Sequence, residues 1–171
     1  GTTPWTFGNL VVGNGSVAGT TTSASNATTT ILGRFLIATG HTFAAGGSHI
    51  DLRGSGTVFV ENGVFAEATS TVRYSGTTGS NVLSTTYYDL EVMALGGSPT
   101  FVGTGLGIIV SRDLTVGGAT TTTLTLDTND PAFDVNGTVR ISTTGTLVGS
   151  NSGALTVAGG WDNDGTFTGS G

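Results

Sequence analysis

Apolar and polar residues alternate along the chain in short runs. Within each run Val, Leu, Ile or Phe occupies every second position, as expected where one face of a strand is buried. Asn-Gly and Gly-Gly pairs between the runs are typical of tight turns. The clearest runs are residues 10–12, 57–60, 71–74, 113–116, 123–126, 138–141 and 154–157. The pattern predicts an all-β protein.

Two stretches depart from this simple alternation. Residues 28–39 are ambiguous between helix and strand, and we interpret them as strand; no other stretch carries a helical stripe with caps. Residues 16–30 contain few bulky side chains, so we expect a loop there.

Similar strand contexts recur in two series, residues 10–58 and 90–155, at intervals of 20–26 residues within each, and a rung of about 20–25 residues is typical of a solenoid. They are centred on Leu10, Leu36, Val58, Leu90, Leu114, Val135 and Leu155. We therefore predict a β-solenoid, similar to a parallel β-helix. A β-sandwich, which also has short strands at close spacing, is the alternative, although it does not require internal similarity.

Two phrases of the sequence recur at a longer distance. Residues 6–12 match residues 86–92 at an offset of 80, with an aromatic residue, an amide or acid, Leu and Val at the same places. Residues 62–65 match residues 164–167 at an offset of 102. The later copy has thus gained about 22 residues. A gain of this length corresponds to one inserted rung, and we assign the inserted rung to residues 134–151.

Composition and charge exclude several classes of protein. Charged residues make up 9% of the 171 residues, the net charge is −6, and the basic residues are five scattered arginines. Such a chain is not suited to nucleic acid or to an anionic membrane. The absence of Cys excludes disulfides and thiolate sites, and no apolar segment is long enough to span a membrane. The chain begins with Gly, which fits an exported protein or an excerpt of a longer one.

Three phrases resemble the repeats of large bacterial cell-surface proteins. They are residues 87–92, 112–118 and 155–167, and the last combines a strand, Gly-Gly, Trp, an Asn/Asp-rich turn and Gly-Thr-Phe. The resemblance extends over most of the chain from residue 58 onward. It implies a right-handed β-helix in an adhesin-like, exported structural protein, and it implies no catalytic residues.

Residues 1–171 are expected to form a single repetitive β domain that opens and closes within a repeat, without capping elements. Uncapped rungs leave strand edges and apolar faces available for further strands. We therefore expect the chain to assemble with copies of itself in a head-to-tail homopolymer. Its candidate interface residues are the aromatic side chains near the two ends: Trp5, Phe7, Trp161 and Phe167.

Calcium is the best candidate for a small ligand, because oxygen-rich turns provide hard ligands. The candidate carboxylates are Asp127, Asp130, Asp134, Asp162 and Asp164. These carboxylates belong to two stretches, residues 127–134 and 162–165, and neither stretch has the spacing of an EF-hand or of a calcium-binding β-roll. The alternative is that Asp and Asn bond to the backbone of their own turns.

Three further groups of residues have a plain structural interpretation beside a functional one. His41 and His49 with Asp51 could hold zinc, or the histidines could be surface residues. Asp51 and Arg53 could serve catalysis in a groove, or they could alternate on the solvent face of one strand. The third group is aromatic and contains Trp5, Phe7, Tyr87, Tyr88 and Trp161. These side chains could stack on carbohydrate or form an interior aromatic stack, and their recurrence at repeat positions favours the interior stack.

The threonine clusters and three Asn-X-Ser/Thr sequons, at Asn14, Asn26 and Asn136, are candidates for glycosylation, with exposed threonine ladders as the alternative.

Taken together, these features favour an extracellular or cell-surface structural protein that forms a fibre, filament or stalk by end-to-end stacking or strand exchange. We expect no enzyme activity and no cofactor other than a possible calcium ion. One alternative is an adhesin module that binds surface or matrix glycans. Another is a polysaccharide-degrading β-helix.

Overall fold

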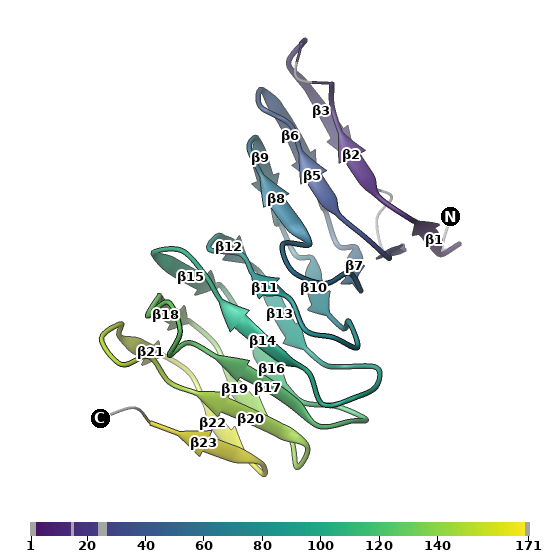
Figure 1. The fold of residues 1–171 in the computed structure, drawn as a ribbon. Helices are drawn as coiled ribbons and strands as arrows, with labels where there is room; N and C mark the ends of the chain where they lie inside the picture. Colours follow the sequence, from purple (N-terminus) through teal and green to yellow (C-terminus); the bar gives the residue numbers. More distant parts are fainter. Residues whose placement is uncertain (1–2, 15, 24–26, 170–171) are drawn as a thin grey trace.

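The chain folds as a stack of three-stranded rungs (Figure 1). The computed structural model describes residues 3–14, 16–23 and 27–169, and these contain strands and turns but no helix. All neighbouring strands pair in parallel, each with the strand that lies three places further along the chain. The predicted β-solenoid is thus confirmed over the β-sandwich.

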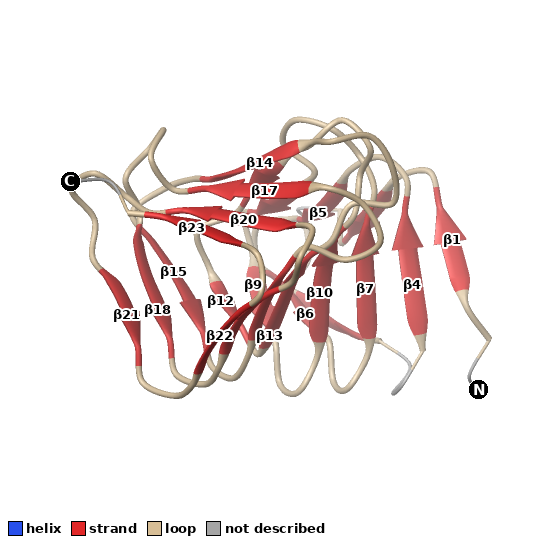
Figure 2. Ribbon diagram, turned by 90° about the horizontal axis from the view of Figure 1, so that it is seen from below, coloured by secondary structure: helices blue, strands red, loops and turns tan. Residues whose placement is uncertain are grey.

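One face of the stack is a continuous sheet of eight strands, which we call the long sheet. Figure 2 shows several of its strands side by side, with the two ends of the described chain on opposite sides of the stack. Its strands, in order, are β1 (Trp5–Phe7), β4 (Thr28–Ile31), β7 (His49–Leu52), β10 (Thr71–Tyr74), β13 (Asp89–Val92), β16 (Leu114–Val116), β19 (Val139–Ile141) and β22 (Trp161–Asn163).

The other two faces are each divided into an earlier and a later sheet. The second face contains β2 (Leu10–Val12), β5 (Phe35–Ile37) and β8 (Phe59–Glu61), then β11 (Asn81–Val82), β14 (Thr100–Gly103), β17 (Thr122–Thr125), β20 (Gly145–Val148) and β23 (Thr166–Thr168). The third face contains β3 (Gly19–Thr22), β6 (His41–Ala44) and β9 (Val64–Ala66), then β12 (Thr86–Tyr87), β15 (Gly107–Val110), β18 (Ala132–Val135) and β21 (Leu155–Val157).

Alternating burial explains how the stack is stabilised. In the long sheet Leu90 and Leu114 are paired partners, and both side chains are fully buried, while Glu91 and Thr115 between them and their neighbours face outward. Each rung thus adds a layer of Val, Leu, Ile or Phe to one continuous core. Burial of this apolar surface, together with the parallel backbone ladders, stabilises the stack.

The division of two faces has a local cause in chain length. Thr71 and its partner Asp89 are separated by only 18 positions in sequence, and every other rung of the long sheet is longer. The short rung holds the two-residue strands β11 and β12. Besides the long sheet, one isolated bridge, between Gly56 and Ser80, spans this junction among the described residues.

The same corner is built in both halves of the stack. The side-chain Oδ1 of Asn9 accepts a hydrogen bond from the N–H of Arg34, one rung further on (2.7 Å). Asp89 accepts one from the N–H of Asp113 (3.3 Å), and Asp113 accepts one from that of Thr138 (2.8 Å). The Asn9 corner joins the long sheet to the second face, whereas the Asp89 corner joins the third face to the long sheet. The repeat therefore slips by one face within the short rung.

This slip explains the two repeated phrases of the sequence. The match at an offset of 80 pairs equivalent corners, although the strands involved belong to different sheets. Gly63 and Gly165, from the other phrase, also lie in equivalent corners, where an added Cβ would meet two backbone oxygens and one Ile side chain. Between the two matched points the later segment contains one more rung of three strands, as its extra length predicts.

The spacing of strand contexts is confirmed only in part. Leu90 and Leu114 are partners on successive rungs of the long sheet, as their spacing predicts. Val135 and Leu155 belong to the third face instead, because the partner of Leu114 on the next rung is Val139. Contexts that look alike in sequence thus fall on different faces where corner lengths differ.

The expected loop at residues 16–30 is wrong. It contains β3 and the start of β4, and its β-branched threonines suit an extended backbone even where they are exposed. Residues 24–26, in the middle of this stretch, lie outside the described part of the chain. The strand interpretation of residues 28–39 is confirmed, since they form β4 and β5 with a corner between them.

Candidate functional site

The last rung that the structure describes exposes an aromatic pair. Trp161 on β22 and Phe167 on β23 meet edge to face, with ring centroids 5.0 Å apart. Both side chains are about two-fifths exposed, because each of the two strands has a neighbour on one side only. Apolar surface and one backbone edge are therefore open together at this end of the stack.

The rung at the opposite end has a similar character. The rings of Trp5 and Phe7 on β1 are stacked, with centroids 6.0 Å apart, and Trp5 is 57% exposed. Together with Leu10 and Phe43 they line a mostly apolar hollow. The four predicted interface residues thus form one aromatic pair at each end of the described stack. That they mediate assembly stays a prediction.

Trp5 and Trp161 stand at the two ends of one inward-facing row of the long sheet and are exposed because each end strand has a neighbour on one side only. The row between them holds no aromatic side chain, so the expected interior aromatic stack is wrong for these two residues. Tyr87 is fully buried, and Tyr88 is half-buried beneath the guanidinium of Arg112, 5.0 Å from its ring centroid. Other side chains supply the aromatic core of the earlier half, where rings from successive rungs stack on each other. These are Phe35 with Phe59 and Phe43 with Phe65.

The outer face of the long sheet carries the ion pairs of the molecule. All five that the described residues form lie on this face or at its edges. One outward position, followed in register from β7 to β22, forms what we call the charge column; the same row carries Thr6 and Thr30 on the two strands before β7. Its members, in order, are Asp51, Arg73, Glu91, Thr115, Arg140 and Asp162.

Opposite charges are neighbours within the charge column. The Nε of Arg73 donates to Glu91 (2.6 Å), and the Nε of Arg140 donates to Asp162 (3.0 Å). Thr115, with its short neutral side chain, separates these two pairs. The column thus alternates in sign and is interrupted once.

A polar hollow lies where Thr115 interrupts the charge column. Glu91, Arg112, Asp113 and Arg140 are among the side chains that line it. Arg112 is bound on one side to Asp89, and this hydrogen bond raises the pKa of the guanidinium above its usual value. With Asp89 included, three carboxylates and two guanidinium groups line the hollow, so it carries a small net negative charge.

Sequence reasoning missed this face. Each member of the column is a whole rung of sequence away from the next, so the members are adjacent only when the rung register is known. The detectable signal is that Asp, Arg or Glu stands at the centre of an apolar–polar–apolar triplet in the runs at 49–52, 71–74, 89–92 and 139–141.

Asp51 and Arg53 are brought together as a pair, and Asp51 stands in the outward row of the long sheet. The Nε of Arg53 donates to Asp51 (2.8 Å), and the Asp51 side chain is almost fully buried. The hydroxyl of Ser75, on the next rung, also donates to Asp51. The expected alternation is therefore right about the face of Asp51 but wrong about its exposure to solvent, because a cation and a hydroxyl cover the carboxylate and satisfy its charge.

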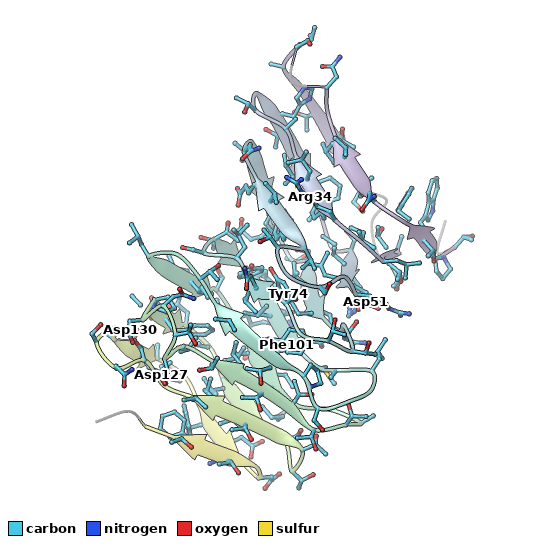
Figure 3. The ribbon with its side chains drawn as sticks, viewed as in Figure 1. Arg34, Asp51, Tyr74, Phe101, Asp127 and Asp130 are labelled. Atoms are coloured by element: carbon cyan, nitrogen blue, oxygen red, sulfur yellow. The ribbon has the colours of Figure 1, made fainter. Side chains whose placement is uncertain are left out.

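Two of the calcium candidates lie in one turn, between β17 and β18 (Figure 3). The Oδ1 of Asp130 accepts the backbone N–H of Asn151 (2.6 Å) and of Ser152 (3.3 Å). The hydrogen bond from Asn151 lowers the pKa of the Asp130 carboxyl. The side chain of Asn151 also donates to Asp127. Both carboxylates therefore bind the turn of the next rung, whereas the alternative interpretation expected bonds to the backbone of their own turn.

The remaining calcium candidates lie elsewhere. Asp134 accepts a hydrogen bond from the hydroxyl of Thr156, Asp162 pairs with Arg140, and Asp164 lies in the turn before β23. The described residues contain no group of three His, Cys, Asp or Glu side chains placed to hold one metal ion. Calcium binding stays a prediction without a gathered site.

The two histidines lie on different faces, at the starts of β6 and β7. His41 is buried against Gly13 of the preceding rung, so it is a packed residue rather than the expected surface one. His49 is half-buried, and desolvation lowers its pKa. Of the sequon asparagines, Asn14 and Asn136 are exposed, and Asn26 lies outside the described residues.

The described residues form no helix long and apolar enough to cross a membrane. The chain matches no protein-family model, no curated protein sequence and no solved structure.

Proposed function

We propose that this chain is a structural element of an extracellular fibre, filament or stalk, in which solenoid rungs continue from one copy to the next. The observation that carries this proposal is the pairing of open strand edges with exposed aromatic side chains on both outermost described rungs. Parallel edges of this kind accept further strands, and an apolar cluster beside them supplies favourable burial.

The expected junction follows from the geometry of the long sheet. Every neighbouring pair within it is parallel, so the open edge of β22 would meet β1 of the next copy in the same sense. The pair Trp161–Phe167 would then face the pair Trp5–Phe7. Such a contact is heterologous and does not close on itself, and it therefore builds an open polymer.

The resemblance to repeats of bacterial cell-surface proteins supports the extracellular placement in this proposal, as does the absence of Cys. The low content of charged residues also suits the role, because rungs at about 4.8 Å spacing bring like groups close together.

The experiment is to purify the chain and follow its length distribution by electron microscopy and sedimentation. We expect unbranched filaments whose average length rises with concentration. Trp161→Asp places a charge in the proposed junction and should leave single copies. Leu106→Asp is the matched control, because Leu106 is 94% exposed in the turn before β15 and should leave assembly unchanged. Single copies of the unaltered chain at high concentration would overturn the proposal.

A second candidate function is glycan binding, which the exposure of Trp5 and Trp161 favours, since exposed indole rings stack on sugars. A glycan array probed with Trp161→Asp copies separates the two candidates. Binding through Trp5 alone, without filaments from the unaltered chain, would favour the adhesin module.

A further inference from the structure

The charge column has an internal symmetry that points to a partner. Counting rungs outward from Thr115, Glu91 on one side corresponds to Arg140 on the other, and Arg73 corresponds to Asp162. Each corresponding pair has opposite charges. From Arg73 to Asp162 the column is therefore antisymmetric about Thr115, while Asp51, one rung further out, has no counterpart on the other side.

An antisymmetric column is complementary to its own reversed copy. A twofold axis that runs parallel to the strands and over Thr115 places two long sheets face to face with their stacks in opposite directions. Arg73 of each copy then faces Asp162 of the other, and Glu91 faces Arg140. The two Thr115 side chains meet on the axis, where their small size permits close approach. A twofold contact of this kind makes every charge pairing twice.

We propose that the outer face of the long sheet pairs with the same face of a second copy through the charge column. This contact is distinct from end-to-end stacking, because it uses a side of the solenoid rather than its ends. It closes as a dimer of single copies. In a stacked filament it would hold two antiparallel filaments together laterally.

The groups beside the column are compatible with this contact. Asp113 directly precedes β16, the strand that carries Thr115. In the proposed dimer the Asp113 side chains of the two copies approach each other near the twofold axis. Arg112 lies 3.6 Å from Asp113 and also binds Asp89, so each copy brings a cation to the same place. The side chain of Arg140 is more than half exposed, and that of Asp162 is half exposed. Those of Arg73 and Glu91 are about one-quarter exposed, so a second copy can contact all four.

The other outward faces lack this property. The outward positions of β14, β17, β20 and β23 carry Thr and Val in register, without any charged side chain. On the third face, Asp134 stands in register between Ile109 and Thr156, without a cation beside it in that row. A charge pattern that could select an antiparallel partner thus belongs to the long sheet. Since the matched area is roughly a few hundred Å² per copy, the pairing should be weak and sensitive to salt.

The test is a charge exchange between positions 73 and 162, measured by sedimentation velocity at low salt. All proteins carry Trp161→Asp, which removes end-to-end stacking, so that failure of this proposal and failure of the proposed function are distinguishable. This background chain should show a monomer–dimer equilibrium that weakens as salt is added. Arg73→Glu and Asp162→Arg should each weaken dimerisation about tenfold.

The double variant Arg73→Glu/Asp162→Arg should recover dimerisation to near the background value, because each new charge meets its opposite on the partner. The two positions are four rungs apart within one chain, about 19 Å, so recovery cannot come from a direct contact inside it. Arg34→Glu, which makes the same charge change at an exposed corner, should leave dimerisation unchanged.

Circular dichroism and thermal melting confirm that each variant is folded. A background chain that stays monomeric at millimolar concentration and low salt would overturn the proposal. So would a double variant that dimerises no better than the single ones, even if filaments form normally in the unaltered protein.

Discussion

The phenol oxygens of Tyr74 and Tyr87 lie 2.9 Å apart, fully buried inside the short rung. Tyr87 donates to the carbonyl of Leu83 (2.8 Å), and Tyr74 accepts the N–H of the same residue (3.2 Å). The two side chains thus satisfy the backbone at the point where β11 ends and two of the three faces are interrupted. Figure 3 places Tyr74 at this junction between the two halves of the stack.

Stability should fall at alkaline pH because of this pair. Burial raises the pKa of Tyr74 to about 12 and that of Tyr87 well above its usual value. An unfolded tyrosine loses its proton near pH 10, so the unfolded state is favoured as pH rises above that value. The stabilisation is present in full below pH 10 and declines toward pH 12. Urea unfolding at pH 8 and at pH 11 measures this loss.

Tyr74→Phe should be destabilised at pH 8, where it lacks two hydrogen bonds, and should lose less stability than the unaltered chain on going to pH 11. Tyr88→Phe, which alters a half-buried tyrosine outside the pair, serves as control. An equal alkaline loss in Tyr74→Phe and the unaltered chain would contradict the assignment.

The corner made by Asn9 should depend on an oxygen acceptor rather than on the amide. Asn9→Ala leaves the N–H of Arg34 without its partner and should cost about 1 kcal/mol of unfolding free energy. Asn9→Asp should retain the stability of the unaltered chain, because Asp89 and Asp113 accept the same bond in the later half. Thermal melting compares the two variants, and an equal loss in both would refute the equivalence of the corners.

Gly63 should not tolerate a side chain. A Cβ at this position would contact the backbone oxygens of Ala38 and His41, so the neighbouring rung would have to move. We expect Gly63→Ala to cost about 1–3 kcal/mol, as overpacking of a fixed backbone does. Gly8→Ala is the control, because a Cβ added there would have nothing within 4 Å. Chemical denaturation of both variants gives the comparison, and equal values would argue against close rung contact.

Leu114 should be intolerant of charge. The side chain is fully buried between Leu90 and Val139, so Leu114→Asp would place an unpaired carboxylate in the core and cost several kcal/mol. Leu106→Asp, at an exposed position, should melt like the unaltered chain. Normal expression and melting of Leu114→Asp would show that the register described for the long sheet is incorrect.

The alternation of apolar residues was sufficient to predict the fold class, because each strand buries one side in the same way. The face to which a strand belongs was not predictable in the same manner. Val135 and Leu155 resemble Leu114 in local sequence but lie on another face, since the number of residues at each corner varies. The slip of one face within the short rung shortens the spacing of Thr71 and Asp89, but that spacing has meaning only when the register of the two strands is known.

The candidate sites were predictable to a different extent. Trp5, Phe7, Trp161 and Phe167 could be identified from their positions near the two ends of the chain. The charge column could not, because its members come from different rungs and depend on register. Arg73 and Glu91, for example, belong to successive rungs and are hydrogen-bonded in the fold.

The most direct test of the structural role is cryo-electron microscopy of filaments grown from the purified chain. Eight rungs of the long sheet at about 4.8 Å predict a rise of about 38 Å per copy if the sheet continues across the junction. Filaments with this rise, a strong repeat near 4.8 Å and density joining β22 to β1 are the expected result. Discrete single copies, or filaments joined through another surface, would contradict end-to-end stacking.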